Sequence, residues 1–274
     1  MAKRHSRAGS VDVDGQPALL QQRHPLAMVY GGGGVVGIAY TAGVAAGLVA
    51  AGIPVAGAPA LGTSAGSWTA SALALGLTYD DLADLPVPSV PAVRNGVLAE
   101  IARMVFEESS HPLVSVSAVC VRSRRRHILD GGKYALADLV AASSAVPGLL
   151  PPHRVDGRLY VDGGMWSATS VDAAEEADRV IVVAPLAGRV MGPMGRVAGA
   201  LLDRELDRWQ QRHPEADIHM IRPNREMSKI VGVRPLALFD VERARAVHPL
   251  AYEQGVRWGE HIQSSGSSRR ESTG

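Results

Sequence analysis

The sequence predicts an α/β protein in which helices cover both faces of one mostly parallel β-sheet. Short apolar runs alternate along the chain with segments of helical length. The late run Val180-Ile181-Val182-Val183 is continuously apolar, as in a parallel strand buried on both faces. Two earlier apolar runs end in glycine-rich turns that open helices. Strand, glycine turn and helix therefore recur in the order expected for a covered parallel sheet.

Length and composition indicate one domain with two polar ends. The chain has 274 residues, 46% of them hydrophobic, which is enough for one sizeable core. We expect a single domain over residues 25–263, a disordered extension over residues 1–24 and a disordered tail over residues 264–274. The extension lacks the apolar stretch of a signal peptide. No apolar run approaches the ~20 residues of a membrane-spanning helix. We expect a cytoplasmic protein whose contact with a membrane, if any, is peripheral.

Charge and cysteine content exclude other classes. Lys plus Arg number 28 and Asp plus Glu 27, so no overall field attracts nucleic acid, and no nucleic-acid partner is expected. The single cysteine, Cys120, permits no intramolecular disulfide and lies in a run typical of a buried strand. We assign no metal ion and no cofactor, and the sequence does not indicate an oligomeric state.

The first half of the chain contains two strand, loop and helix units. The first unit is a strand over residues 26–30, four glycines, and an Ala-rich helix over residues 38–51 that ends at Gly52. The second is an apolar run over residues 55–61, a sharp turn, and a helix from Ser67 to Leu75. We then expect a short acidic helix after Thr78, a proline-rich loop over residues 85–95 and a helix over residues 96–108.

The second half begins with two hairpins. A strand over residues 113–121 is followed by four arginines among residues 122–126, which we interpret as a solvated turn before a strand over residues 127–129; phosphate head groups or RNA are the alternative partners. Asp156-Gly157 joins the second hairpin. The other expected elements are helices over residues 134–144, 171–177 and 197–212, strands over residues 153–155, 158–161, 179–184 and 218–221, and one or two closing helices over residues 241–263, broken at Pro249.

A serine at the second glycine turn has the surroundings of a nucleophile. The turn is made of Gly62, Thr63, Ser64, Ala65 and Gly66. Such a strained strand-to-helix elbow lifts the serine hydroxyl above the sheet, and the glycines two residues before and after leave room for the turn. The helix N-terminus also favours developing negative charge. Taken alone, Ser64 is equally well explained as a helix cap.

The first glycine loop has two interpretations. In residues 31–37 the backbone N–H groups can approach a substrate oxygen closely, as an oxyanion hole requires. Gly32, Gly34 and Gly37 also satisfy the G-x-G-x-x-G pattern of a dinucleotide site. That site needs an acidic residue roughly 20 positions further on, and residues 41–79 contain no Asp or Glu. The nucleotide-binding interpretation is therefore the weaker one.

The general base is better sought among aspartates than histidines. None of the nine histidines, including His219 and His248, has a setting typical of a catalytic base. Two Asp-Gly-Gly triplets begin at Asp130 and Asp162. Asp130 is explained by a turn, whereas Asp162 ends a hairpin strand and follows the unusual segment of residues 142–152. Context favours Asp162.

Four motifs in this order resemble the patatin-like phospholipases. They are the glycine loop, Gly-Thr-Ser-Ala-Gly, Ser-Ser-Ala-Val-Pro-Gly-Leu-Leu-Pro-Pro, and Asp-Gly-Gly after Arg-Leu-Tyr-Val, all within residues 26–185. The resemblance implies a three-layer α/β/α fold and a lipid acyl hydrolase that cleaves acyl esters of phospholipids or other lipids. It implies Ser64 as nucleophile and Asp162 as general base, without histidine. Gly32, Gly33 and Gly34 would form the oxyanion hole, and Gly163 and Gly164 would support Asp162.

The chain departs from the family pattern at two places. Val36 stands where members usually carry Arg or Lys, and Met165-Trp166-Ser167-Ala168-Thr169-Ser170 replaces an Asn-rich run. The first change could weaken catalysis, so a catalytically weak or inactive lipid-binding protein is the alternative function. Residues 191–194 are a candidate lid or membrane-touching loop, with an ordinary surface loop as the alternative.

Overall fold

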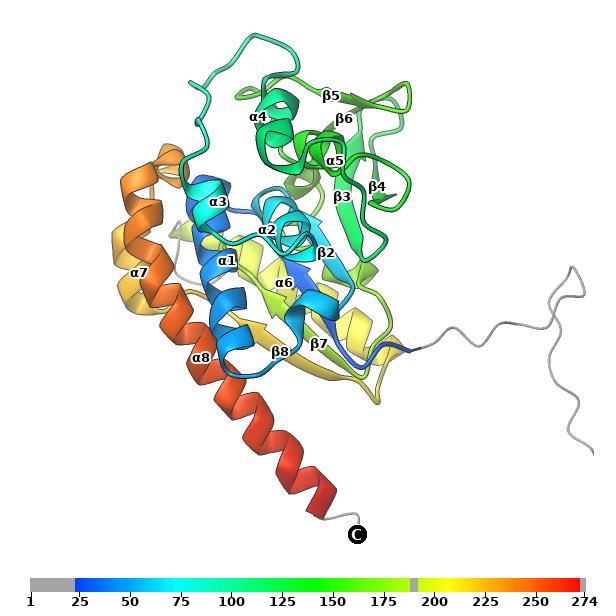
Figure 1. The fold of residues 1–274 in the computed structure, drawn as a ribbon, viewed down its shortest axis with the longest axis vertical. Helices are drawn as coiled ribbons and strands as arrows, with labels where there is room; N and C mark the ends of the chain where they lie inside the picture. Colours follow the sequence, from blue (N-terminus) through cyan, green and yellow to red (C-terminus); the bar gives the residue numbers. More distant parts are fainter. Residues whose placement is uncertain (1–22, 188–191, 272–274) are drawn as a thin grey trace, which may run out of the picture.

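One mixed β-sheet forms the centre of the protein (Figure 1). The computed structural model describes residues 23–187 and 192–271. Within them the sheet has eight strands in the order β5-β6-β3-β2-β1-β7-β8, and β4 pairs with β3. Five strands are parallel, namely β3, β2, β1, β7 and β8. Strands β4 and β6 each run antiparallel to β3, one on either edge of it. The predicted mostly parallel sheet is confirmed. The strands are β1 Ala27–Tyr30, β2 Ala60–Thr63, β3 Val114–Cys120, β4 Arg125–Asp130, β5 His153–Val155, β6 Arg158–Asp162, β7 Arg179–Val183 and β8 Asp217–Ile221.

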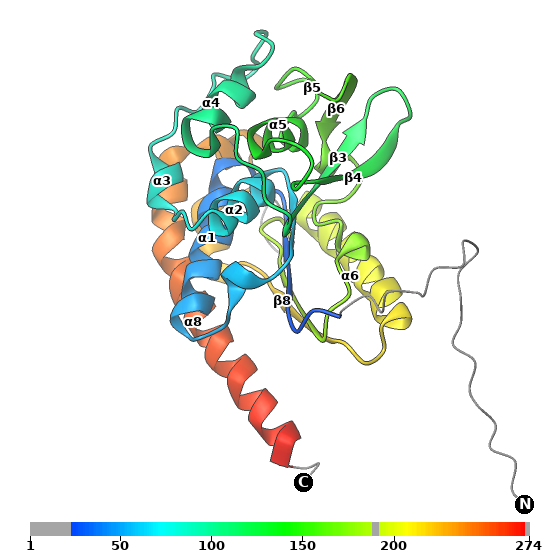
Figure 2. The same ribbon diagram turned by 45° about the vertical axis from the view of Figure 1, so that its right-hand side comes forward.

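Helices lie on both faces of this sheet, which gives three layers (Figure 2). The side chains of a strand alternate between faces, and two separate clusters of buried apolar residues result. Met28 and Ile181 contact the first helical layer, whereas Val29 and Val182 contact the second with Trp209. The first layer contains α1 (Gly34–Ala50), α2 (Ala65–Ala74), α4 (Val97–Phe106), α5 (Leu136–Ser143) and α8 (Val241–Glu271), and the second is α6 (Pro193–Arg212).

Helices α1 and α8 pack at very short range because glycines line their contact. A Cβ atom on Gly47 would lie 2.1 Å from the Tyr252 carbonyl oxygen, and one on Gly255 would lie 2.3 Å from the Val44 oxygen. The expected break at Pro249 is wrong, because Pro249 lies inside α8, which continues past it. Close packing along α1 stabilises the helix despite the N–H group that proline lacks.

The tail differs from its expectation for a related reason. Helix α8 continues to Glu271, so residues 264–271 are helical where a disordered tail was expected. Once a helix is formed, each added residue gains a hydrogen bond without a new nucleus, so a polar segment can extend it. Residues 272–274 lie outside the described residues, as does the expected N-terminal extension up to residue 22.

Three further segments differ from the predicted elements. The run over residues 55–61 becomes a strand only at Ala60, after a 3₁₀ turn at Val55–Gly57 (η1). The expected helix over residues 171–177 is only a 3₁₀ turn at Val171–Ala173 (η3), because its backbone carbonyls bond to α6 side chains instead. Residues 222–240, for which no element was expected, contain α7 (Arg225–Val231) and a 3₁₀ turn at Pro235–Phe239 (η4). The short helix α3 spans Asp80–Ala83.

The part of the chain that the structure describes contains no helix both long and apolar enough to cross a membrane.

Candidate active site

Sheet register brings Ser64 and Asp162 together. Thr63, the last residue of β2, pairs with Ser117 of β3, and Ser64 follows it directly. Strand β6 then takes over the same edge of β3, with Asp162 paired to Ala118. Two residues almost 100 positions apart in sequence thus flank neighbouring positions of one strand. The Ser64 side chain lies close enough to the Asp162 carboxylate to oppose the rise of its pKa.

The backbone of Ser64 has the strained form expected for an elbow. Its φ of 50° and ψ of −119° are unusual for a residue with a side chain. The strain persists because the flanking glycines leave no room to relax it. A Cβ atom on Gly62 would lie 2.5 Å from Ser67 Cα, and one on Gly66 would lie 2.0 Å from the Tyr30 carbonyl oxygen. Strand, turn and helix are arranged here as the sequence predicts.

Buried serines fix the elbow against β3. The Ser64 backbone N–H donates to Ser143 Oγ at 2.8 Å, and that hydroxyl donates to the Ser117 carbonyl oxygen at 2.7 Å. The Ser67 hydroxyl donates to the Ser64 carbonyl oxygen at 2.6 Å. Beside it, Trp68 Nε1 donates to Ser144 Oγ at 3.1 Å. No sequence pattern indicates roles for these serines, because they come together only when α5 packs against β3.

The Asp162 carboxyl is buried, and its surroundings change its pKa. Burial raises its pKa to about 6, although the nearby Ser64 side chain and a hydrogen bond from the Gly164 backbone oppose that rise. The Gly164 N–H donates to Asp162 Oδ1 at 2.6 Å. Asp130 makes the same turn bond to Gly132 at 2.8 Å, but its side chain is 46% exposed and pairs with Lys133. The two Asp-Gly-Gly triplets are thus alike locally, and only Asp162 is near Ser64.

The glycine loop differs in one respect from the predicted oxyanion hole. The Gly32 N–H already donates to the Ala168 carbonyl oxygen at 2.8 Å. Gly33 and Gly34 begin α1, where backbone N–H groups have no partner within the helix. Gly34 has a φ of +62°, and a Cβ atom there would lie 2.7 Å from the Leu238 carbonyl oxygen. The free donors therefore belong to Gly33 and Gly34, while Gly32 holds the loop in place.

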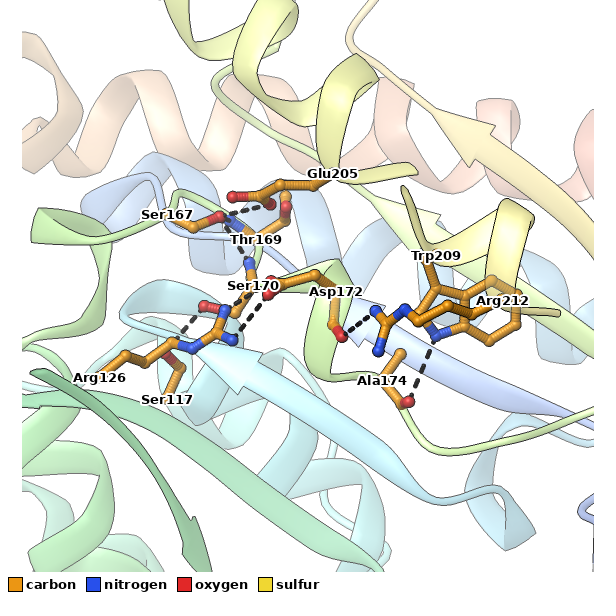
Figure 3. Close-up of polar contacts among 10 residues, drawn as sticks. All are labelled: Ser117, Arg126, Ser167, Thr169, Ser170, Asp172, Ala174, Glu205, Trp209 and Arg212. Atoms are coloured by element: carbon orange, nitrogen blue, oxygen red, sulfur yellow. Dashed lines mark hydrogen bonds and ion pairs between the residues drawn. The ribbon is translucent and has the colours of Figure 1, made fainter. Parts of the chain in front are cut away.

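The segment after Asp162 is held by a polar network on the α6 side of the sheet (Figure 3). Ser167 donates to Glu205 of α6 at 2.7 Å and accepts from the Ser170 N–H at 2.8 Å. The Ser170 hydroxyl contacts the Ser117 hydroxyl at 2.8 Å. These bonds position Ala168, whose carbonyl oxygen binds the glycine loop. Serines and Glu205 thus stabilise the segment in which the Asn-rich run is replaced.

An ion pair fixes the end of the same segment. The two terminal guanidinium nitrogens of Arg126 donate to the Asp172 carboxylate oxygens, at 2.5 and 2.8 Å (Figure 3). Burial alone would raise the Asp172 pKa, but the hydrogen bonds and charge of Arg126 make the net shift a lowering. The Asp172 carbonyl oxygen also accepts from Arg212 at 2.8 Å. Arg126 therefore connects β4 to the segment that follows Asp162.

Ser64, Asp162 and the glycine loop line a cavity of about 410 Å³. Its other walls are mostly apolar and come from α2, α3, α4, η4 and the proline-rich loop. Among the described residues, Asp162 is the only carboxylate in the lining, and no Lys, Arg or His contributes to it. Representative apolar lining residues are Trp68, Val87, Leu98, Ile101, Leu149 and Leu238.

The two histidines considered above and the unusual Val36 lie away from the dyad. His248 stacks on Tyr79 with ring centroids 4.1 Å apart, and His219 contacts Asp217 at 3.1 Å. Val36 is buried beneath Leu238 in an apolar space that also involves Met227 of α7. Of the candidate lid, Met191 lies outside the described residues, Gly192 precedes α6, and α6 begins at Pro193.

Two comparisons with known proteins found similarities to this chain. Residues 82–175 match the model of the patatin-like phospholipase family. The match includes Asp162 and ends before β7, but it begins after Ser64 and the glycine loop. In a comparison of structures, the chain is similar to the crystal structure of VipD from Legionella pneumophila, with 15% identity and a TM-score of 0.44 over 95% of this chain and 71% of that one. No curated protein matches the chain in sequence.

Proposed function

We propose that this chain belongs to the patatin-like phospholipase family and is a serine hydrolase that cleaves acyl esters of lipids through Ser64 and Asp162. The observation that carries the proposal is that Ser64 and the buried Asp162 lie together in the wall of an apolar cavity. An apolar lining suits an acyl chain, because transfer of apolar surface from water is favourable. The elbow and the adjacent glycine loop supply the remaining parts that acyl transfer requires.

The reaction has two stages. In the first, Ser64 Oγ attacks the ester carbonyl carbon while Asp162 takes the hydroxyl proton, and the Gly33 and Gly34 N–H groups stabilise the oxyanion. The tetrahedral intermediate then expels the alcohol, which receives the proton from Asp162, and an acyl-serine remains. In the second stage, water transfers a proton to Asp162 and attacks the acyl-serine. Collapse releases the fatty acid and returns the proton to Ser64.

Hydrolysis of short and long p-nitrophenyl esters tests the proposal. Ser64→Ala and Asp162→Asn should fall to background, because one removes the nucleophile and the other the base. Two matched controls should keep activity within about threefold, as changes away from an active site usually do. Ser71→Ala removes a buried hydroxyl from the same helix, one without a hydrogen-bond partner. Asp130→Asn alters the other Asp-Gly-Gly triplet.

Labelling by a fluorophosphonate gives a second readout. The wild type and both controls should label, and Ser64→Ala should not. If the wild type neither labels nor hydrolyses any ester, the proposal is wrong. Undiminished binding of a fluorescent fatty acid by wild type and Ser64→Ala would then support the lipid-binding alternative.

A further inference from the structure

The tips of two β-hairpins lie side by side at one end of the sheet. The turn between β3 and β4 covers residues 121–124, and the turn between β5 and β6 covers residues 156–157. The Val121 N–H donates to the Leu159 carbonyl oxygen at 2.9 Å, which joins the two hairpins. Figures 1 and 2 both draw the ends of these strands together, far from the C-terminal end of α8. An open groove of about 640 Å³ lies between the tips.

These tips carry positive charge that no ion pair neutralises within the described part of the chain. Five arginines there are exposed, and none forms an ion pair with an acidic side chain in residues 23–187 or 192–271. The nearby acidic residue of the β5–β6 turn, Asp156, faces the Tyr134 hydroxyl. Three of the arginines line the groove together with Ser123 and His127. The five are Arg122, Arg124, Arg125, Arg154 and Arg158.

Apolar side chains are exposed among these charges. Val121 is 43% exposed and Leu159 is 37% exposed, and both line the same groove. Exposed apolar residues surrounded by Arg are typical of surfaces that touch a bilayer, where the cations meet phosphate groups and the apolar groups enter the interface. A single-strand RNA surface would offer aromatic rings for stacking on bases, and the described groove residues include no Trp, Tyr or Phe.

The tips share the end of the sheet that carries the candidate active site. Strand β3 is parallel to β2 and ends at Cys120, just beyond the level of Thr63 and Ser64. At the same end, Met165 lines the active-site cavity and is 62% exposed, and its neighbour Trp166 is 53% exposed. The Arg126 guanidinium lies 5.9 Å from the Trp166 ring centroid. A bilayer in contact with the tips would therefore be near the cavity.

We infer that the hairpin-tip surface docks the protein on bilayers that contain anionic phospholipids, with the groove holding lipid phosphate. We define this surface as Val121, Arg122, Arg124, Arg125, Arg154, Arg158 and Leu159. Its action is independent of Ser64 chemistry, so the inference goes beyond the proposed hydrolysis. The chain has a formal net charge of only +1, and the local concentration of arginines provides the attraction.

Sedimentation with phospholipid vesicles tests the inference. All proteins carry Ser64→Ala, so that no lipid is hydrolysed and docking is measured apart from catalysis. The Ser64→Ala protein should bind vesicles of phosphatidylcholine and phosphatidylserine and should be released by added salt. Arg122→Gln, Arg125→Gln and Arg158→Gln together should weaken binding by roughly 100-fold, since each basic residue near an anionic surface contributes about fivefold. Val121→Ser with Leu159→Ser should weaken it by about tenfold.

The matched control removes the same charge elsewhere. Arg204→Gln, Arg208→Gln and Arg257→Gln lie on α6 and α8 and should leave binding within about threefold. Equal losses in both triple variants would overturn the inference, because net charge alone would then explain docking. Equal binding to pure phosphatidylcholine would also overturn it. So would binding of inorganic phosphate or of single-stranded RNA by the tips without binding of anionic vesicles.

Discussion

At the scale of single residues, the protonation state of Asp162 affects stability and, in the proposed reaction, activity. Its carboxylate is buried in an apolar wall, which raises its pKa, and the nearby Ser64 side chain and the hydrogen bond from Gly164 compensate only partly. A carboxylate with its usual pKa is a weak base toward a hydroxyl, and desolvation strengthens it. The price of this basicity is a charge that destabilises the folded state.

The first prediction concerns the pH dependence of hydrolysis. Because the base must be ionised, kcat/KM on a soluble ester should rise with pH through an apparent pKa of about 6 and stay level above it. Below that value it should fall about tenfold for each pH unit. The measurement is kcat/KM over the range in which the protein stays folded, with far-UV circular dichroism as the control. A midpoint near 4 would show that burial does not tune Asp162.

The second prediction concerns the stability of Asp162→Asn. The folded protein holds the Asp162 proton more tightly than the unfolded chain, because the folded pKa of about 6 exceeds the ordinary 3.8. Ionisation of Asp162 therefore destabilises the folded wild type. The loss in free energy of unfolding grows between pH 4 and pH 6 and reaches about 3 kcal/mol above pH 6. Asp162→Asn should be inactive yet more stable than wild type at pH 8, with little difference near pH 4. Urea unfolding at the two pH values measures this.

The matched comparison is Asp130→Asn, whose side chain is half exposed. It should show no such gain in stability at pH 8. If Asp162→Asn is less stable than wild type at pH 8, the altered contacts with Ser64 and Gly164 outweigh the removed charge, and the predicted sign is wrong.

Val36 departs from the family pattern, yet its side chain is well packed. Its side chain is buried in the apolar core near Leu238 and Met227, which belong to η4 and α7. A long cation at this position would enter an apolar space, where an unpaired charge is very unfavourable. The glycine loop is instead positioned by Leu238 against Gly34 and by the Ala168 carbonyl against Gly32. Apolar packing thus occupies the place in which family members usually carry Arg or Lys.

At the scale of elements, the elbow depends on the contact between α2 and β1. Gly66 lies so close to Tyr30 that the helix and the strand could not both keep their places around a larger residue. The strained φ of Ser64 follows from this contact, because the turn has no space in which to relax.

The third prediction compares two glycine substitutions. Gly66→Ala should destabilise the fold by more than the 1–3 kcal/mol typical of overpacking, because the new Cβ would meet backbone atoms at 2.0 and 2.3 Å. It should also abolish fluorophosphonate labelling, since the elbow must shift. Gly57→Ala is the control, with no heavy atom within 4 Å and a change expected within about 0.5 kcal/mol. Thermal unfolding measures both. Normal stability and labelling of Gly66→Ala would contradict the rigid elbow.

The sequence predicts features that depend on local signals better than features that depend on contacts between distant segments. The sheet strands, the elbow and the hairpins follow from local signals: apolar runs, Asp156-Gly157 and glycines at turns. The position of Ser64 beside Asp162 depends on β2 and β6 sharing an edge of β3, which no local pattern encodes. The bond from Gly32 to Ala168 and the cover of α7 and η4 are likewise tertiary. Residues 222–240 lack a clear apolar period, so their packing could not be predicted.

At the scale of the whole molecule, the cavity is assembled from segments distant in sequence. The strand ends contribute Ser64, Asp162 and the glycine loop, whereas α4 and η4 contribute apolar walls. The proposed reacting groups and the apolar walls of the cavity therefore come from different elements. A substitution in a wall can change the size of the cavity without changing the elbow. Preference among acyl chains then depends on the walls.

The fourth prediction uses this separation. Leu98 of α4 lines the cavity and lies outside the elbow and the glycine loop. Leu98→Trp should reduce the space for an acyl chain, so kcat/KM for a long-chain p-nitrophenyl ester should fall at least about tenfold while that for the acetate stays within about threefold. Val93→Trp, at a side chain 94% exposed, controls for the added indole. Equal losses on both esters would mean that the substitution disturbs Ser64 or the fold. An unchanged preference would place the acyl chain elsewhere, because a bound chain in this cavity must meet the indole.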